Sequence, residues 1–168
     1  KPDELLLLKK SVWIDIKGKE NGGKDHFVPE QGEKAIEMVL NAFALKDEFP
    51  SLYIISPFKS VVQSMKILLK KYISSNYPDL NEEDINNWID KSCGTIHTFQ
   101  GKEANEVILI LGCDENSGVK AAQWASKKPN ILNVAVTRAK YRIAIIGDSN
   151  LWRQFPNFDL EYKILSKE

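Results

Sequence analysis

The chain has 168 residues, of which 43% are hydrophobic and 27% are charged, and its 23 basic and 23 acidic side chains cancel. This length and composition predict one globular domain and exclude collagen-like, low-complexity and disordered proteins. A net charge of zero excludes a protein that coats nucleic acid by its overall charge, so nucleic-acid binding would need a local groove. Two cysteines and no apolar run near the roughly 20 residues of a membrane span favour a reduced, cytoplasmic protein.

The first half of the chain alternates short apolar runs with helical patterns. Its predicted elements, in chain order, are a linker over residues 1–10, a strand over 12–16, a glycine-containing loop over 17–29, a helix over 30–46, a strand over 52–56, a helix whose apolar face runs over 61–72, and a polar helix over 81–91. Apolar residues recur every three or four positions in the helical segments, whereas the strands are continuous apolar runs. Trp88 in the polar helix is interpreted as a structural anchor rather than as a platform for base stacking.

The second half of the chain continues the alternation. Its predicted elements are strands over residues 94–98 and 107–111, a polar connection over 114–130, a helix over 131–140, a strand over 142–147, and a helix over 149–155 followed by a final turn or two. Trp124, inside the polar connection, is also interpreted as an anchor. Strands that are apolar on both faces are typical of a parallel sheet covered by helices. The pattern therefore predicts one α/β domain over residues 1–168, with an open, mostly parallel sheet flanked by helices.

Common phosphate-binding and metal-binding motifs are absent from the sequence. It contains no G-x-x-x-x-G-K-[ST] loop and no G-x-G-x-x-G after a strand. With two histidines, no H-E-x-x-H and no C-x-x-C, no metal site is predicted. Residues 114–118 have a weak similarity to a calcium-binding loop, but the glycine is one position early and no glutamate ends the loop, which favours a solvated turn.

Two segments carry more chemically active side chains than a plain fold needs. Residues 95–103 (TIHTFQGKE) place Thr, His, Gln, Lys and Glu after a predicted strand, where open α/β sheets bind ligands. Residues 133–140 (NVAVTRAK) contain one of three arginines among 23 basic residues, and such a chain keeps arginine where its planar fork matters. The residues alone leave simpler interpretations open: His97 as a strand histidine, Glu103 as a solvated charge, and Arg138 as a surface arginine paired with a carboxylate.

Together these two segments resemble motifs V and VI of superfamily-one helicases, in the branch that includes the nonsense-mediated-decay helicase and its bacterial relatives. Residues 54–63 (IISPFKSVVQ) are similar to a strand, turn and helix of this family, with Phe58 where its members usually have tyrosine. Residues 145–148 (IIGD) fit the strand after motif VI, and the blocks follow the family's order over residues 11–155. The resemblance implies the second, C-terminal RecA-like domain of a helicase, a P-loop NTPase-type fold that lacks its own P-loop.

The resemblance also implies roles for residues that face a nucleotide. Arg138 matches the arginine finger that reaches the γ-phosphate of ATP across an interdomain cleft, and Thr137 is expected to orient its helix. Glu103 matches a carboxylate that binds the ribose hydroxyl, and Gly101 a glycine that lets the backbone approach the phosphates. Gln100 is expected to couple the nucleotide surface to the nucleic-acid surface.

On the nucleic-acid side, the resemblance implies contacts to a single strand of DNA or RNA from Ser56, Lys59, Thr95 and His97. The implied function is one half of an ATP-dependent translocase. ATP with Mg2+ would be bound mainly by an upstream RecA-like domain, so the chain is expected to be part of a longer protein and to be inactive as an ATPase alone. The alternative is a non-motor module that keeps the fold for nucleotide sensing or protein interaction. Walker motifs in the upstream sequence would distinguish the two.

Overall fold

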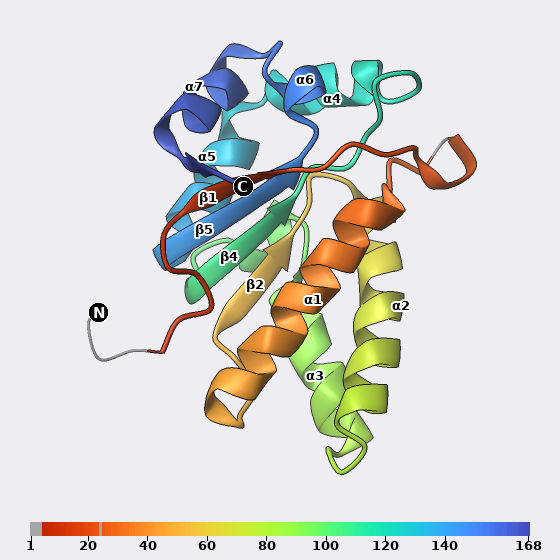
Figure 1. The fold of residues 1–168 in the computed structure, drawn as a ribbon, viewed down its shortest axis with the longest axis vertical. Coiled ribbons are helices and arrows are strands. Elements are labelled where there is room, and N and C mark those ends of the chain that lie inside the picture. Colours follow the sequence, from red (N-terminus) through yellow and green to blue (C-terminus); the bar gives the residue numbers. More distant parts are fainter. Residues whose placement is uncertain (1–4, 24) are drawn as a thin grey trace.

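The computed structural model of the chain describes residues 5–23 and 25–168. Its centre is one sheet with the strand order β3-β2-β4-β5-β1-β6, in which every pair of neighbours is parallel (Figure 1). The strands are β1 (Val12–Asp15), β2 (Leu52–Ile55), β3 (Cys93–Gly94), β4 (Ala104–Ile110), β5 (Ala139–Gly147) and β6 (Ser166–Lys167). The predicted open α/β sheet is thereby confirmed, and it is consistent with the RecA-like fold that the resemblance implies.

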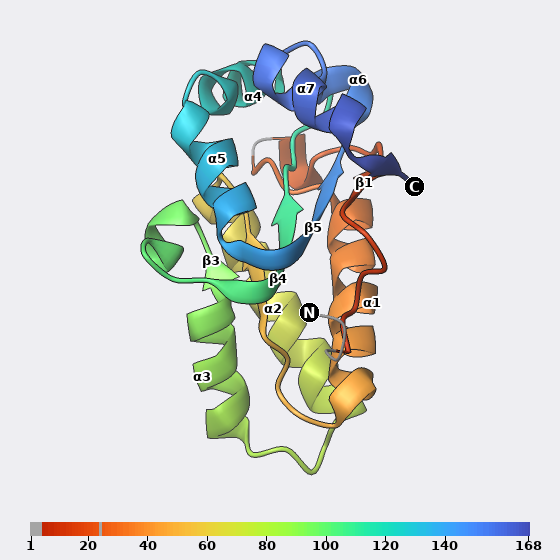
Figure 2. The same cartoon turned by 90° about the vertical axis from the view of Figure 1, so that its left-hand side faces the viewer.

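Helices cover the sheet in two groups, which Figures 1 and 2 show from two sides. The first group packs α1 against α2 and α2 against α3, and the second joins α4, α5, α6 and α7. The helices are α1 (Pro29–Lys46), α2 (Lys59–Asn76), α3 (Glu82–Ser92), α4 (Val119–Ser126), α5 (Pro129–Thr137), α6 (Ser149–Trp152) and α7 (Pro156–Ile164), with 3-10 helices η1 (Asn21–Gly23) and η2 (Ile96–Phe99). Among the described helices, none is both long and apolar enough to cross a membrane.

The core consists of the central strands and of large aromatic side chains between the sheet and its helices. Val107 to Ile110 in β4 are fully buried, as a strand with helices on both faces requires. The buried indoles of Trp13 and Trp152 donate hydrogen bonds to the carbonyls of Gly147 and Gly112, both at 3.2 Å. A buried indole with its N–H satisfied adds apolar contact without an unpaired polar group. These contacts fix the ends of β4 and β5, where polar loops begin.

Trp88 is the structural anchor that the sequence predicts. It is buried among Phe43 and Phe49, and its Nε1 donates to the carbonyl of Pro50 at 3.0 Å. The ring centroids of Trp88 and Phe43 lie 5.1 Å apart at an edge-on angle, which is a favourable arrangement for aromatic pairs. Trp88 therefore ties α3 to the loop that leads into β2.

The predicted strand over residues 94–98 is wrong beyond its first residue. Only Cys93 and Gly94 pair with β2, and the chain then forms η2. The physical reason is topological. β3 ends where the parallel strands of the sheet end, whereas β4 has to begin where they begin. The connection has to turn back across the sheet instead of extending the strand, and it passes beside α5 (Figure 2).

The boundaries of the last third of the chain also differ from the prediction. The polar connection over residues 114–130 contains α4, which buries Ala122 and Ala125. Small alanines make a weak apolar signal in a polar stretch, so the helical pattern was not visible. The predicted helix over 131–140 ends at Thr137, and β5 already begins at Ala139. The predicted helix over 149–155 is shorter, and β6 is an additional short edge strand.

Residues 5–10 lie along the sheet, and part of this segment is held tightly. The amides of Leu7 and Leu8 each donate to a carboxylate oxygen of Glu106 at 2.7 Å. Arg142, which is the register partner of Glu106 on β5, donates to the carbonyl of Leu8. Leu8 is buried. The second half of the segment expected to be a linker is therefore anchored to β4 and β5.

Candidate nucleotide and nucleic-acid surfaces

The segment over residues 95–103 joins two opposite edges of the sheet. β3 ends at Gly94 on the side of the sheet where the parallel strands end, which we call the carboxyl edge. β4 begins at Ala104 on the side where the strands begin, which we call the amino edge. Thr95 and His97 therefore lie toward one edge, and Glu103 lies at the other. The residues predicted to bind nucleic acid and those predicted to bind nucleotide therefore lie toward opposite ends of the strands, although they are adjacent in sequence.

Arg138 and Glu103 both lie at the amino edge. Arg138 lies between α5 and β5, and its carbonyl accepts a hydrogen bond from the amide of Ala104 at 3.0 Å. Its half-buried guanidinium donates from Nη1 to the carbonyl of Phe99 and from Nη2 to Oγ1 of Thr137, both at 3.2 Å. Nε is buried and has no hydrogen-bond partner among the described residues. Two of the five N–H groups of this guanidinium thus donate to neutral acceptors, and the others have no hydrogen-bond partner among the described residues.

No carboxylate of the described residues forms an ion pair with Arg138, unlike Arg153, which pairs with Asp159 at 2.7 Å. The interpretation of Arg138 as a surface arginine in an ion pair is therefore not what the structure shows. Thr137 does contact this side chain, and its hydroxyl also donates to the carbonyl of Asn133 at 2.8 Å. A half-buried cation without a protein anion is a suitable partner for an anionic ligand.

Tyr53 links the charges at this edge. Its ring stacks on Phe99 with centroids 4.3 Å apart. Burial raises the pKa of the Tyr53 phenol, the charge of Arg138 opposes this rise, and the charge of Glu103 adds to it. Both charged groups therefore act on one aromatic side chain, which places them around a common surface at the amino edge.

The turn between these groups is exposed and open. Gln100, Gly101 and Glu103 are all exposed. Gly101 has a φ of +74°, and no heavy atom lies within 4 Å of the position that a Cβ would take. Glycine is therefore required here by the backbone conformation, since the surrounding space is free. The same free space leaves the main chain of Gly101 accessible to a ligand.

At the carboxyl edge, a groove of about 720 Å3 brings together three of the four residues predicted to contact nucleic acid. It is lined by His26, Pro57, Phe58, Lys59, Ser60, Thr95, Ile96, His97, Trp124, Lys127, Lys128 and Ile131. Ser56 does not line it. The Ser56 side chain is buried, and its Oγ accepts a hydrogen bond from the amide of Phe58 at 3.3 Å. Ser56 thus shapes the turn before α2.

The groove contains an aromatic and basic wall that the sequence interpretation missed. Trp124 is 48% exposed, its ring lies 6.2 Å from that of Phe58, and Nζ of Lys128 lies 4.2 Å above it. Trp124, interpreted from the sequence as a structural anchor, is thus half exposed at the groove and not enclosed in the core. The Phe58 ring also lies 4.7 Å from the ring of His26. A signal was present in the sequence, because Trp124 is followed by two adjacent lysines in an otherwise polar stretch.

The turn after β4 is not the solvated turn that the sequence suggests. Asp114 is buried, and its Oδ1 accepts hydrogen bonds from the amides of Asn116 and Ser117 and from the Ser117 hydroxyl. Its Oδ2 accepts from the amide of Glu20 at 2.7 Å. Burial raises the pKa of Asp114, but these hydrogen bonds outweigh it and hold the pKa below its ordinary value. The carboxylate organises two loops at the carboxyl edge.

Comparisons with known proteins agree with this architecture. Residues 3–150 match a family described as an AAA domain. The chain is also similar to a protein of Methanocaldococcus jannaschii called an uncharacterized ATP-dependent helicase, with 26% identity over 145 residues. The similar region covers 84% of this chain and 18% of that relative, so the chain spans less than a fifth of the relative's length.

Proposed function

The chain belongs to the AAA-domain family, and on that basis we propose that it is the C-terminal RecA-like motor domain of an ATP-dependent helicase of superfamily one. Its two surfaces would act on ATP at the amino edge and on single-stranded DNA or RNA at the carboxyl edge. The name of the archaeal relative supports a helicase-type domain. The observation that carries the proposal is Arg138, a half-buried guanidinium with unused donor capacity and no protein anion beside it among the described residues.

In this proposal, Arg138 neutralises the negative charge that develops on the γ-phosphate during hydrolysis. Glu103 accepts a hydrogen bond from the ribose, and the exposed backbone of Gly101 lies against the phosphates. Nη1 and Nη2 of Arg138 each use one of their two N–H groups within the described residues, and a phosphate oxygen could accept the remaining ones. Mg2+ and most of the phosphate contacts would come from an upstream RecA-like domain, because this sequence has no P-loop.

The carboxyl-edge groove supplies what a single strand requires. Bases stack on exposed aromatic rings, and lysines neutralise the phosphates between them. Trp124 offers the ring, with Lys128 above it and Lys59 and Lys127 along the wall. Thr95 and His97 border the same space. Because stacking and phosphate contacts are common to both polymers, the groove suits single-stranded DNA and single-stranded RNA alike.

The two surfaces are joined by η2. His97 lies in η2 at the groove, and the same short helix ends at Phe99, whose carbonyl accepts the hydrogen bond from Arg138. A movement of the Arg138 guanidinium toward a phosphate would break or lengthen this bond. We infer that η2 and the following Gln100 couple nucleotide state to the position of the groove residues.

The decisive experiment measures ATP hydrolysis by the full-length protein with and without single-stranded DNA and RNA. Arg138→Ala should fold normally and lower kcat by about 10³–10⁵-fold, because a finger arginine acts mainly in the transition state. Arg138→Lys should restore little of this loss, since an ammonium cannot reproduce the planar fork. The matched control is Arg153→Ala, which removes an arginine paired with Asp159 at the surface.

The control should retain a normal kcat. A normal kcat for Arg138→Ala would instead remove this residue from the reaction. If the full-length protein hydrolyses no ATP under any of these conditions, the non-motor alternative, a nucleotide-sensing or protein-interaction module, is favoured.

A further inference from the structure

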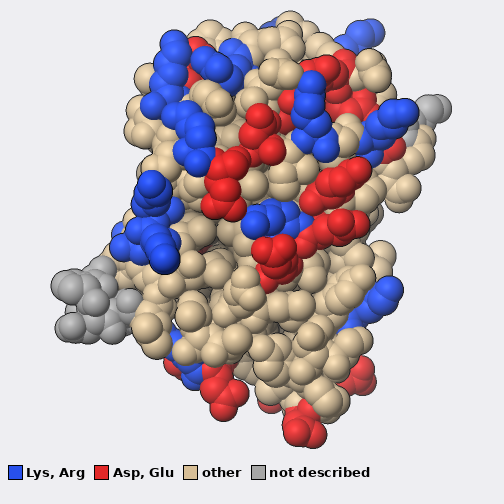
Figure 3. Space-filling model, in the orientation of Figure 1, with Lys and Arg blue, Asp and Glu red and all other residues tan. Residues whose placement is uncertain are grey.

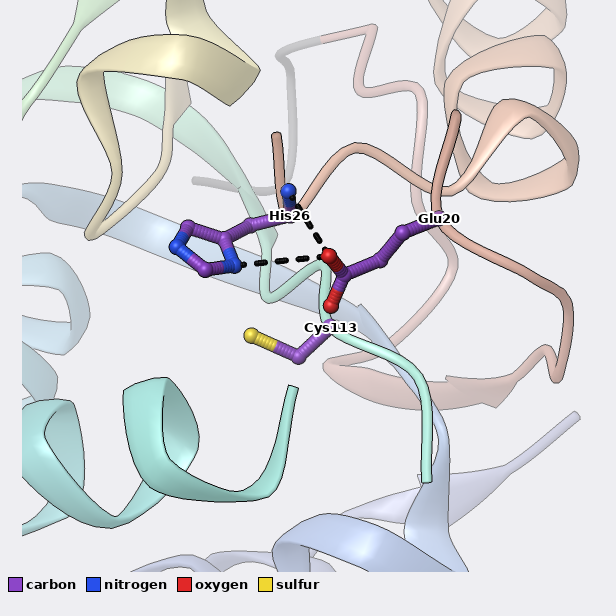
Figure 4. Close-up of side chains that lie close together, drawn as sticks. All are labelled: Glu20, His26 and Cys113. Atoms are coloured by element: carbon purple, nitrogen blue, oxygen red, sulfur yellow. Dashed lines mark hydrogen bonds and ion pairs between the residues drawn. The ribbon is translucent and has the colours of Figure 1, made fainter. Parts of the chain in front are cut away.

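Beside the groove, two segments that are far apart in the sequence bring three metal-ligating groups together. Glu20 and His26 come from the loop between β1 and α1, and Cys113 comes from the segment after β4 (Figure 4). One ligand atom of each, a carboxylate oxygen, an imidazole nitrogen and Sγ, lies within 4.8 Å of the other two. Figure 4 shows Nδ1 of His26 directed at the Glu20 carboxylate, with Cys113 on the adjacent side.

A direct hydrogen bond between His26 and Glu20 does not explain this arrangement. Nδ1 of His26 lies 3.6 Å from Oε1 of Glu20, beyond hydrogen-bond distance. Nδ1 is nevertheless buried and has no hydrogen-bond partner among the described residues. The Glu20 side chain is completely buried, with one backbone amide donating to each oxygen at 3.1 Å. Two ligands about 2.1 Å from a tetrahedral ion lie roughly 3.4 Å apart, so the observed separation suits a shared cation.

We propose that Glu20, His26 and Cys113 bind one Zn2+ ion. A carboxylate, an imidazole and a thiolate are the ligands that zinc takes in proteins, and the sulfur disfavours Mg2+ and Ca2+. With no pair of ligand atoms more than 4.8 Å apart, shifts of under about 1 Å bring all three within bonding distance of a central ion. Three protein ligands leave a fourth position for water or for a ligand oxygen.

The surrounding backbone holds these ligands in place before any ion binds. The amide of Cys113 donates to the carbonyl of His26 at 2.8 Å, and Oδ2 of Asp114 accepts from the amide of Glu20. A Cβ at position 118 would lie 2.5 Å from both Cβ of Cys113 and Oε2 of Glu20, so only glycine allows the turn to pack against the site. Preorganised ligands bind a metal with less ordering cost.

The proposed zinc site adjoins the groove at the carboxyl edge. His26 also lines the groove, and its ring contacts Phe58 there. A bound ion would fix the loop that contains Glu20 and His26 to the carboxyl end of β4. The zinc site would therefore stabilise one wall of the groove, and it does not depend on the motor activity proposed above.

The test uses the purified protein, stripped of metal, kept reduced with a phosphine and titrated with Zn2+ in equilibrium dialysis. We expect one Zn2+ per chain and a higher melting temperature with zinc. Because loss of an outer-shell partner already costs roughly 10–100-fold in metal affinity, Cys113→Ser should weaken zinc binding by at least about tenfold. The matched control is Cys93→Ser, which changes the other buried free cysteine, in β3, and should bind zinc normally.

Two further measurements make the result decisive. Co2+ bound in place of zinc should give a thiolate-to-metal absorption band in the near ultraviolet that Cys93→Ser retains and Cys113→Ser loses. His26→Asn is a second variant, because asparagine tolerates the left-handed conformation of residue 26, whose φ is 60°. It should weaken zinc binding similarly. Zinc binding that is equal in wild type, Cys113→Ser and His26→Asn, or absent from all three, overturns the proposal and leaves a His–Glu pair.

Discussion

Trp124 shows how strongly one side chain depends on its tertiary surroundings. Its ring is about half exposed, lies beside Phe58, and has the ammonium of Lys128 above its face. A ring in this position contributes little to the core, and its exposed part is accessible to a flat ligand. A cation over the ring adds a second partner for a nucleotide, because a phosphate follows every base. The same combination of ring and lysine is what single-strand binding requires.

We expect Trp124→Ala to weaken the binding of single-stranded nucleic acid by about 1–3 kcal/mol, the contribution of one stacked base. The melting temperature should change little, since the ring is half exposed. Fluorescence anisotropy of a labelled oligonucleotide measures the affinity. Ile67→Ala is the control, because Ile67 is an exposed apolar residue that does not line the groove. Equal affinity of Trp124→Ala and wild type would contradict stacking at this position.

At the scale of elements, β4 and β5 together hold the N-terminal segment. The Glu106 carboxylate accepts the amides of Leu7 and Leu8. Burial raises the pKa of Glu106, and the two hydrogen bonds and the charges of Arg142 and Lys46 oppose this rise without cancelling it. An acid with a raised folded-state pKa stabilises the fold below its ordinary pKa, and this contribution is lost as the pH rises through the folded-state pKa.

Glu106→Gln should lower the free energy of unfolding by about 1–3 kcal/mol, because one amide oxygen cannot accept from both backbone amides and one donor stays unpaired. The sign of the pKa shift adds a pH dependence. The stability difference between wild type and variant should be larger near pH 4 than near about pH 8. Chemical denaturation at the two pH values measures it, and hydrogen exchange at Leu7 and Leu8 reports the segment directly. Glu33→Gln, an exposed change in α1, is the control. Unchanged exchange at both amides would show that Glu106 does not hold the segment.

At the scale of the whole molecule, the parallel sheet separates two surfaces and η2 joins them. Basic and acidic side chains are interspersed on the face drawn in Figure 3, in agreement with the net charge of zero. Long-range attraction of a polyanion therefore does not come from an overall positive charge. In the proposed function, binding therefore depends on the lysines that line the groove, namely Lys59, Lys127 and Lys128.

The affinity for single-stranded nucleic acid should accordingly fall steeply with salt. Each neutralised phosphate contributes about 0.7 to the slope of log K against log salt on a single strand. Changing Lys59, Lys127 and Lys128 to Gln should reduce this slope by about 2. The control changes Lys70, Lys91 and Lys163 to Gln, which alters the net charge equally outside the groove. Equal slopes for the two triple variants would contradict binding in the groove.

The sequence by itself determined the layered architecture and the residues of the amino edge. Continuous apolar runs predict buried parallel strands because burial on both faces leaves no room for polar side chains, and β1, β2, β4 and β5 follow these runs. Helical spacing predicted α1, α2 and α3 for a similar local reason. Arg138 and Glu103 could be singled out because they lie in two compact motifs, each within a few residues of chain.

Only the tertiary structure decided which distant residues meet. Because β3 and β4 run in the same direction, residues 95–103 lead from the carboxyl edge of the sheet back to its amino edge. The residues of this one motif therefore lie on two separate surfaces, which no local sequence pattern encodes. The exposure of Trp124 depends on where α4 lies against the turn after β2. The cluster of Glu20, His26 and Cys113 brings together the loop after β1 and the end of β4, so its ligand spacing does not exist along the chain. Local sequence determines secondary structure through side-chain periodicity, whereas sites built from separate segments depend on packing and strand order.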